Sequence, residues 1–311
     1  MQYTMNETIL RTRNITKEYG GKAAVDDVSM TISKGDIYGL IGRNGAGKTT
    51  LMKIITSLTK YKSGEVELFG ETSAAELNNA RRRTGCVIEM PALYPNLTAV
   101  QNLEYYRILR GIPDKSVVDK ALETVSLTDT GKKKFKEFSL GMKQRLGLAL
   151  SLLNNPDFII LDEPVNGLDP VGIIEMRETF KRLNKEHDIT IMISSHLLSE
   201  LSMTATRYGI INNGKLIKEL TNDELKEQCK QCLSVTVDNL EKALSIIESV
   251  MNTTKYKVIK NREIHLYDYL DTPSEVTFQL NSNGVRVESL SEVSENLEDY
   301  FMSLIGGNKI C

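Results

Sequence analysis

The sequence predicts an α/β protein of two domains, with a larger domain over residues 1–220 and a smaller α+β domain over residues 221–311. Its 311 residues exceed one ordinary domain and suit two domains of unequal size. Short apolar runs alternate with helical patterns over the first two-thirds of the chain, as they do in α/β domains. Near residues 220–223 this alternation changes to another succession of strands and helices, which indicates the domain boundary.

Three apolar runs in the larger domain are predicted to be buried strands that end in polar residues. They are residues 36–42 (DIYGLIG), 158–164 (FIILDEP) and 189–196 (ITIMISSH). Residues 49–58 (TTLMKIITSL) carry apolar side chains at helical spacing, so we expect a helix after the first run. Because ligands of open α/β sheets bind beyond the carboxyl ends of the strands, we expect the functional site at these polar residues.

The remaining stretches complete the expected architecture. Residues 100–153 are mostly helical in pattern, so we expect a helical subdomain over about 90–153. The smaller domain is predicted to run strand, helix, strand, strand, helix, strand, with a final helix over 295–306. This β-α-β-β-α-β order is typical of a ferredoxin-like domain, and no motif in it indicates chemistry.

Composition and hydropathy argue against several classes of protein. The net charge of −2 gives no electrostatic reason to expect a nucleic-acid partner. The longest apolar stretches, 158–161 and 189–193, are far shorter than the roughly 20 residues of a membrane span. The first fourteen residues have no apolar region typical of a secretory signal. We therefore expect a cytoplasmic protein that reaches a membrane only through a partner.

Two clusters have a simpler structural interpretation than a functional one. Cys229 and Cys232 form C-x-x-C, but no second pair or nearby histidine completes a structural zinc site, so we interpret them as a chance pair on a helix over 223–232. A second cluster contains Lys132, Lys133, Lys134 and Lys136. Without interleaved aromatic residues, these lysines favour a solvated face over a nucleic-acid or membrane surface.

The segment GRNGAGKT matches the phosphate-binding pattern G-x-x-x-x-G-K-[ST] and lies between a predicted strand and a predicted helix. Its glycines let backbone N–H groups surround phosphates, and the helix N-terminus favours negative charge. Lys48 is expected to contact the β- and γ-phosphates, and Thr49 to offer its hydroxyl to Mg²⁺. The expected nucleotide-binding residues of this segment are Gly42, Arg43, Asn44, Gly45, Ala46, Gly47, Lys48, Thr49 and Thr50.

Two adjacent carboxylates, Asp162 and Glu163, follow the second predicted strand. A buried strand has no structural need for two acids at its end. Coordination of Mg²⁺ by Asp162 and polarisation of an attacking water by Glu163 explain both. The motif is weak alone and becomes specific beside the phosphate-binding loop.

Together with the segment EFSLGMKQRLGLAL at 137–150, these motifs resemble the ABC ATPase family, and the resemblance covers residues 1 to about 220. It implies an ABC-type P-loop NTPase fold that binds ATP with Mg²⁺. It also implies that Ser139 and Gly141 reach the γ-phosphate of ATP bound by another subunit. The segment departs from the family's usual LSGGQ at Phe138, Leu140 and Met142.

Three further positions are similar to functional residues of that family. Asp169, in NGLDP, falls on the loop that couples the two ATP sites. His196 follows the third predicted strand and matches the switch histidine that contacts the γ-phosphate. Tyr19 matches the aromatic residue that stacks on adenine; a structural role remains an alternative for this tyrosine and for His196.

Glu89 stands where the family normally has a glutamine that touches Mg²⁺ and the attacking water. A carboxylate there adds a negative charge and a hard oxygen ligand, so metal affinity and water activation should differ. This substitution, with the P-x-x-Y-P-N-L-T segment that follows, resembles the bacitracin-resistance and lantibiotic-immunity export branch. A neutral variant in an exporter of another, non-peptide substrate is the alternative.

The resemblance also implies an assembly. One chain has one phosphate-binding loop and one Ser139 loop, so each ATP needs two subunits, and a head-to-tail homodimer is the simplest solution. Residues 94–97 are expected near the groove for an integral-membrane permease, which would hold the protein at the inner face of the cell membrane. Two rivals stay open: a soluble ABC ATPase acting on ribosomes or DNA, and a regulatory role for the C-terminal domain.

Overall fold

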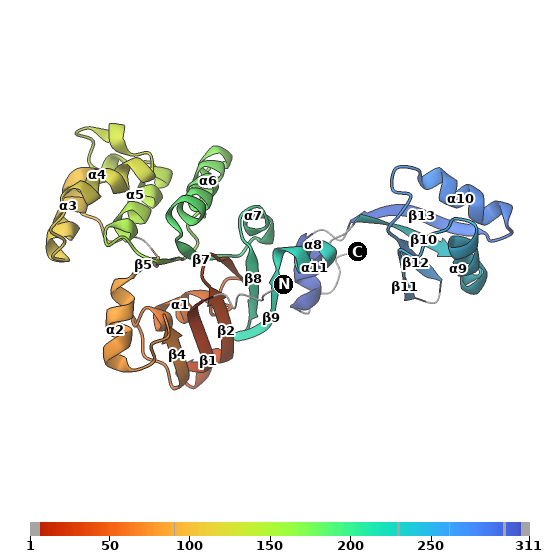
Figure 1. The fold of residues 1–311 in the computed structure, drawn as a ribbon, viewed down its shortest axis with the longest axis horizontal. Helices are drawn as coiled ribbons and strands as arrows, with labels where there is room; N and C mark the ends of the chain where they lie inside the picture. Colours follow the sequence, from red (N-terminus) through yellow and green to blue (C-terminus); the bar gives the residue numbers. More distant parts are fainter. Residues whose placement is uncertain (1–6, 90, 229–230, 261, 295–296, 306–311) are drawn as a thin grey trace. The chain divides into compact units, whose positions relative to one another are not determined.

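A computed structural model of the chain describes residues 7–89, 91–228, 231–260, 262–294 and 297–305. The chain divides into two compact units, residues 1–222 and 223–311 (Figure 1). No helix of the described ranges is long and apolar enough to cross a membrane.

A mostly parallel six-stranded sheet forms the centre of the larger unit. Its strands, in spatial order, are β5 (Thr84–Val87), β6 (Phe158–Leu161), β7 (Thr190–Ser195), β3 (Ile37–Ile41), β8 (Arg207–Asn212) and β9 (Lys215–Thr221). Only β9 runs antiparallel to its neighbour. Strands β3, β6 and β7 are buried at every position, as continuous apolar runs covered on both faces should be. These three strands confirm the three that the sequence predicts.

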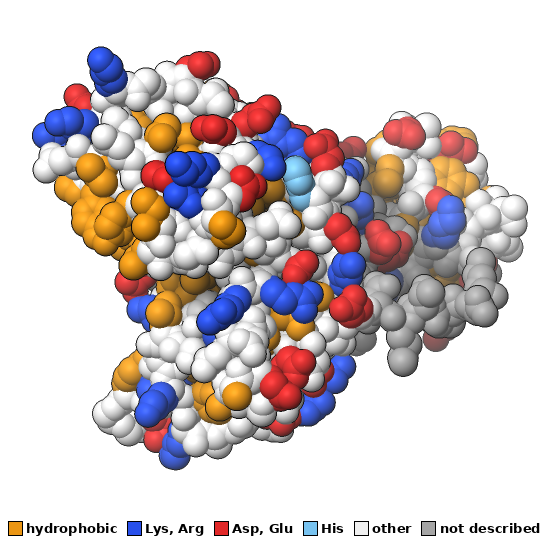
Figure 2. All heavy atoms as spheres, turned by 60° about the vertical axis from the view of Figure 1, so that its left-hand side comes forward, with side chains coloured by type: hydrophobic (Ala, Val, Ile, Leu, Met, Phe, Trp, Pro, Cys, Tyr) orange, Lys and Arg blue, Asp and Glu red, His pale blue; other side chains and the backbone are white. Residues whose placement is uncertain are grey.

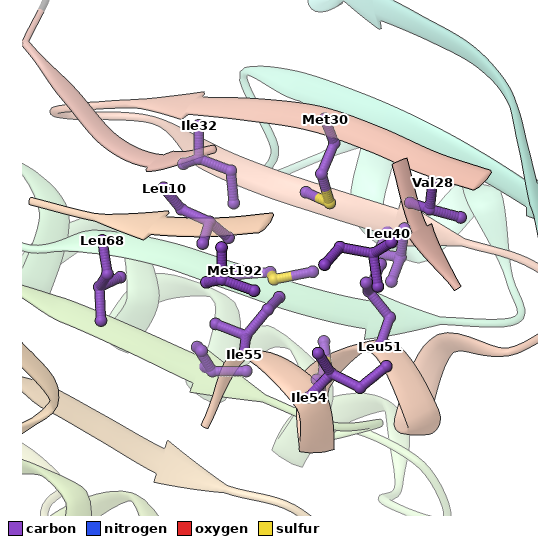
Figure 3. Packing of buried hydrophobic residues seen from close by; sticks show 14 of the residues in the cluster. Leu10, Val28, Met30, Ile32, Leu40, Leu51, Ile54, Ile55, Leu68 and Met192 are labelled. Carbon is purple, nitrogen blue, oxygen red and sulfur yellow. The ribbon is translucent and has the colours of Figure 1, made fainter. Parts of the chain in front are cut away.

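A second, antiparallel sheet covers helix α1 (Lys48–Ile55) from the other side. Its strands are β2 (Lys22–Ser33), β1 (Thr8–Tyr19) and β4 (Ser63–Leu68), and the sequence analysis did not anticipate them. Figure 3 shows the core between the layers, where Leu51 and Ile55 of α1 meet Leu10 of β1 and Met192 of β7. This burial holds α1, and with it the loop that precedes it, in a fixed place at the end of β3.

Helices make up the rest of the larger unit (Figure 1). They are α2 (Ala74–Arg82), α3 (Ala99–Leu109), α4 (Ser116–Thr124), α5 (Leu140–Leu152), α6 (Pro170–His187) and α7 (Leu198–Ser202), with short 3₁₀ turns at Thr128–Thr130 and Phe135–Glu137. Helices α3, α4 and α5 lie in the stretch predicted to be helical. Helix α5 approaches β5 so closely that a Cβ on Gly85 would lie 2.4 Å from the carbonyl oxygen of Ser151.

The smaller unit is built on a four-stranded antiparallel sheet. Its elements are α8 (Asn222–Gln228), β10 (Gln231–Val237), α9 (Leu240–Ser249), β11 (Tyr256–Lys260), β12 (Glu263–Leu266), α10 (Pro273–Ser282), β13 (Val287–Ser294) and α11 (Leu297–Leu304). The spatial order is β11-β12-β10-β13, and β10 to β13 follow the predicted strand–helix–strand–strand–helix–strand order. One apolar cluster joins Leu233 and Val235 of β10 to Ile247 of α9 and Leu280 of α10, so both helices pack on one face.

The helix predicted over 223–232 is wrong at its end. Helix α8 stops at Gln228, and Cys232 lies buried on β10, where its neighbours pair with β13. Cys229 lies outside the described residues. Within the described ranges, no group of three or more His, Cys, Asp or Glu side chains could hold a metal ion.

Candidate functional site

The glycine-rich loop between β3 and α1 has the backbone geometry of a phosphate cradle. Gly47 has a φ of 110°, and a Cβ there would lie 2.5 Å from the carbonyl oxygen of Ala24. A Cβ on Gly42 would lie 2.5 Å from the carbonyl oxygen of Ile211, so both positions require glycine. Gly47 precedes α1 without a side-chain cap, which leaves the first N–H groups of the helix for an anion.

A cavity of about 200 Å³ lies against this loop. Its lining residues are Ala24, Asn44, Gly45, Ala46, Gly47, Lys48, Thr49, Thr50 and Glu163. Seven of the nine loop residues predicted from the sequence are in this list; Gly42 and Arg43 are not. Their carbonyl oxygens instead accept hydrogen bonds from the Lys48 Nζ, at 2.6 and 3.4 Å.

Lys48 is buried, with only 5% of its side chain exposed. Besides the Gly42 carbonyl, its Nζ lies 3.1 Å from Oε1 of Glu163. A buried ammonium requires such partners because it has lost its water. The structure therefore brings the predicted lysine and the predicted acid into direct contact beside the cavity.

Asp162 lies between two hydroxyl groups. Thr49 donates from Oγ1 to Oδ2 of Asp162 at 2.7 Å, and Ser194 donates from Oγ to Oδ1 at 2.6 Å. The Ser194 Oγ also accepts from the backbone N–H of Glu163 at 2.8 Å. Sequence reasoning missed Ser194; the signal was its place among the polar residues at the end of the predicted strand 189–196. Hydroxyl and carboxylate oxygens are the ligands that Mg²⁺ prefers, so this cluster fits that ion.

Both carboxylate oxygens of Glu163 have partners. Oε1 contacts Lys48, and Oε2 lies 2.8 Å from Nδ1 of His196. Glu163 also has a φ of 48°, in the left-handed region that non-glycine residues seldom adopt. The strand ends of β6 and β7 thus place the predicted glutamate and histidine against one another.

Glu89 lies two residues beyond the end of β5 and also has a positive φ, of 62°. Its side chain is 64% exposed, and its Oε1 accepts from the Nζ of Lys53 at 2.6 Å. That hydrogen bond is the main cause of the raised pKa of Lys53. Sequence reasoning did not single out Lys53, because nothing local connects α1 with the end of β5.

Tyr19 ends β1 with about half of its side chain exposed. The Nζ of Lys17 lies 4.7 Å from the centre of its ring. An exposed aromatic face can stack on a planar ligand, as the sequence interpretation requires.

The signature segment and the Asp169 loop occupy a different place. Ser139 caps the N-terminus of α5 and accepts at Oγ from the Met142 N–H at 3.3 Å. Asp169 caps the N-terminus of α6 and accepts from the Gly172 N–H at 2.9 Å. A Cβ on Gly141 would meet only Leu168, at 3.6 Å. Among the described residues, the lining of the cavity at the phosphate loop includes none of Ser139, Gly141 and Asp169.

A glycine cradle at the carboxyl end of a mostly parallel sheet, with a buried lysine and two acids beside it, defines a P-loop nucleoside-triphosphatase. Residues 25–166 match the family model "ABC transporter". The chain is 42% identical over 303 residues to the bacitracin transport ATP-binding protein BcrA of Bacillus licheniformis, covering 97% of this chain and 99% of that protein. It is 45% identical over 216 residues to the lantibiotic transport ATP-binding protein SrtF of Streptococcus pyogenes, covering 69% of this chain and 92% of that protein.

A solved structure supports the same assignment. The dimeric, post-hydrolysis structure of the ATP-binding cassette MJ0796, bound to ADP and Pi, matches with a TM-score of 0.62 and 26% identity, over 69% of this chain and 99% of that chain. The chain therefore belongs to the ABC transporter ATP-binding proteins. It is the ATP-hydrolysing subunit of an ABC transporter.

Proposed function

We propose that this subunit powers a separate integral-membrane permease that exports a bacitracin- or lantibiotic-type peptide, for resistance or immunity. The observation that carries the proposal is the similarity to a bacitracin transport protein over 97% of this chain, C-terminal unit included. The lantibiotic transport protein matches over 69% of this chain. Glu89 supports the same branch, because a glutamate in place of the family's usual glutamine resembles that branch.

We assign ATP binding to the phosphate loop and its cavity. The backbone N–H groups around Gly47 and the Lys48 Nζ hold the phosphates, and the Tyr19 ring stacks on adenine. Thr49 and Asp162 would hold Mg²⁺, with Glu89 at the edge of the site. When bound, the ion supplies positive charge that offsets the charge of the phosphate oxygens.

Glu163 is assigned as the general base, and the observed contacts explain how it is controlled. In the structure Lys48 contacts one of its two carboxylate oxygens and His196 contacts the other. Phosphate oxygens attract the Lys48 Nζ more strongly than one carboxylate does. When the Nζ moves to the phosphate, Oε1 of Glu163 loses this contact. Glu163 then accepts the proton of the attacking water, while His196 remains close enough to contact the phosphate.

We assign a head-to-tail homodimer to the active form. The lining of the cavity includes neither Ser139 nor Gly141 of the same chain, which supports γ-phosphate contacts from a second copy. Exposed apolar side chains beside these loops, at Leu140, Val171 and Ile174, support an interface there. Asp169 caps the N-terminus of α6, the helix that carries Val171 and Ile174, and would lie between the two ATP sites.

A surface around α3 is assigned to the permease. Figure 2 shows hydrophobic side chains gathered on one side of the larger unit. Exposed apolar residues of α3 and the loop before it are Tyr94, Val100, Tyr105, Ile108 and Leu109. The buried Asn102 anchors that loop, because its side chain accepts from the Tyr94 N–H at 2.7 Å and donates to the Leu97 carbonyl at 3.3 Å. A rigid loop beside an apolar patch suits the docking of a helix from a membrane protein.

The first experiment is purification of the tagged protein from gently solubilised membranes. We expect a polytopic membrane protein in near-equal amount, and ATPase activity coupled to it. Recovery only from the cytosol, or with ribosomes or nucleic acid, would contradict the transporter partnership.

The substrate needs a separate experiment. Cells without the gene should become sensitive to bacitracin or a lantibiotic, and the wild-type gene should restore resistance. A gene carrying Glu163→Gln serves as the control, since it supplies the folded subunit without turnover. Unchanged sensitivity to both peptide classes would contradict peptide export and leave the ATPase intact.

A further inference from the structure

Helix α1 reaches two acids at once. Its first residue, Lys48, contacts Glu163 at 3.1 Å, and Lys53, in its last turn, contacts Glu89 at 2.6 Å. The first contact belongs to the nucleotide site described above. The second contact lies at the edge of that site, and Lys53 has no role assigned there.

Glu89 and Glu163 occupy equivalent positions on neighbouring strands. Strands β5 and β6 pair in parallel with Val87 opposite Leu161, and the Asp162 N–H donates to the Val87 carbonyl at 2.9 Å. Each glutamate is the second residue beyond its strand, and each has a left-handed φ, of 62° and 48°. Such strained backbone in non-glycine residues is concentrated at functional sites. The site therefore has two acids side by side, each with its own lysine.

Lys53 lies close enough to the residues of the nucleotide and Mg²⁺ site for its charge to act on them. It stands one helical turn after Thr49, whose hydroxyl binds Asp162, so both side chains leave the same side of α1. The pKa of Lys53 is raised first by its hydrogen bond to Glu89 and, to a smaller extent, by the negative charges of Glu89 and Asp162. Its positive charge thus acts on the region where nucleotide and Mg²⁺ would bind.

The ion pair contributes little to folding. The Glu89 side chain is 64% exposed and that of Lys53 is 31% exposed, and exposed ion pairs stabilise proteins only slightly. Its chemical effect is larger, because it changes the net charge at the edge of the site. A glutamine there is neutral, a lone glutamate adds one negative charge, and a glutamate paired with lysine is neutral overall.

We propose that Lys53 is a positioning residue for Glu89 and the cation that compensates its charge beside the nucleotide site. Lys53 holds the carboxylate at the rim, so that a glutamate can replace a neutral amide without strengthening the attraction for the metal. This inference rests on the proposed nucleotide and Mg²⁺ site, and it adds to that site a residue whose charge tunes the response to Mg²⁺.

The test measures binding of a fluorescent ATP analogue to the full-length protein as MgCl₂ is titrated. The variants are Lys53→Gln, Glu89→Gln, the two combined, and Lys34→Gln as a matched control. Lys34 also pairs with an acid, Asp188, at 2.9 Å, and precedes β3, at the end of that strand opposite the phosphate loop. The melting temperature of each nucleotide-free variant is measured alongside.

Lys53→Gln should lower the Mg²⁺ concentration for half-maximal binding by about three- to tenfold, because an uncompensated carboxylate attracts the cation. Glu89→Gln should raise it by a similar factor, because it leaves the lysine uncompensated. The double variant and Lys34→Gln should stay within about twofold of the unchanged protein, with melting temperatures preserved.

Three results would overturn the inference. Lys53→Gln could behave like Lys34→Gln, which would make Lys53 an ordinary surface residue. The double variant could match Lys53→Gln, which would show that Lys53 acts without Glu89. Finally, if Lys53→Gln fails to fold, Glu89→Gln still tests the ion pair, because it leaves α1 unaltered. An unchanged Mg²⁺ response in Glu89→Gln would then contradict a role for the ion pair. Absence of nucleotide binding by the unchanged protein would contradict the proposed site itself.

Discussion

Each unit of the chain contains a contact between a glutamate and a histidine, but the two contacts differ in their surroundings. In the larger unit, Glu163 Oε2 lies 2.8 Å from His196, and its other oxygen contacts Lys48. In the smaller unit, Glu263 Oε1 lies 3.3 Å from His265 and accepts from the Ser234 hydroxyl at 3.0 Å. Glu163 follows the end of a parallel strand beside a cavity, whereas Glu263 is the first residue of β12 in an antiparallel sheet.

This difference shows that the position of a Glu–His pair in the fold, more than the two side chains themselves, makes it a candidate for catalysis. At the end of a parallel strand, the chain turns and presents the carboxylate to the glycine loop after β3 and to the N-terminus of α1. In the smaller unit, β12 pairs with strands on both sides, and Glu263 pairs with Thr236 of β10 and Lys260 of β11. We therefore expect variants of the first pair to change hydrolysis and variants of the second to change only stability.

The largest effect should come from Glu163→Gln. Loss of a general base should reduce phosphate release by at least about 100-fold, while ATP binding persists and the dimer stays closed. An assay of phosphate release measures hydrolysis, and a nucleotide-binding assay measures whether ATP binding persists. Glu263→Gln is the matched control and should hydrolyse ATP at the unchanged rate. Full activity in Glu163→Gln would remove this residue from the role of base.

Lys48→Ala should affect the binding of nucleotide itself. Removing a charged hydrogen-bond donor to phosphate should weaken ATP binding by about 10- to 100-fold. Titration with a fluorescent nucleotide provides the measurement. Lys255, which pairs with Asp268 at 3.0 Å in the smaller unit, is the matched position. If Lys255→Ala weakened binding as much as Lys48→Ala, the loss would not report on a phosphate contact.

A smaller loss is expected from Ser194→Ala. Ser194 holds Asp162 through one hydrogen bond and the Glu163 backbone through another, so its removal should lower hydrolysis by about tenfold. Steady-state ATPase rates at saturating nucleotide measure the loss. Ser234→Ala removes the corresponding hydroxyl from Glu263 and should leave the rate unchanged. Equal rates in the two variants would mean that Ser194 does not position the acids.

The smallest effect concerns stability. The hydrogen bond from Ser234, and then the contact with His265, lower the pKa of Glu263. A lowered folded pKa stabilises the protein above the pKa of the unfolded carboxyl, about 4.3, and this contribution is lost as the pH falls through the folded pKa. The melting temperature of Glu263→Gln should therefore lie below that of the unchanged protein near pH 7, and the difference should shrink by about pH 3. A difference that grew on acidification would contradict this assignment.

Several site residues could be predicted because their signal is local. The loop before α1 must be glycine-rich where its backbone has a positive φ or touches other backbone, and a lysine and threonine must follow at fixed spacing. The acids after β6 were recognisable because a phosphate-binding loop lies in the same domain, which makes specific a motif that is weak alone. Strands β1, β2 and β4 were not anticipated; their burial depends on packing against α1, which no short stretch reveals.

Other features depend on residues far apart in the chain. Lys53 and Glu89 are joined only because α1 packs beside the end of β5, and Ser194 reaches Asp162 only because β6 and β7 pair. The helix predicted through Cys232 ended early because pairing of β10 with β13 outweighed a local helical pattern.

The sequence by itself determined the chemistry of the phosphate loop, the paired acids and the alternation of strands and helices, because backbone conformation and residue type at fixed spacing specify them. Only the tertiary structure decided which charges meet. It placed Lys48 on Glu163 and Lys53 on Glu89, and it kept Ser139 out of the cavity lining of its own chain. These contacts arise from sheet order and from the burial of α1 between two sheets, which depend on the whole chain.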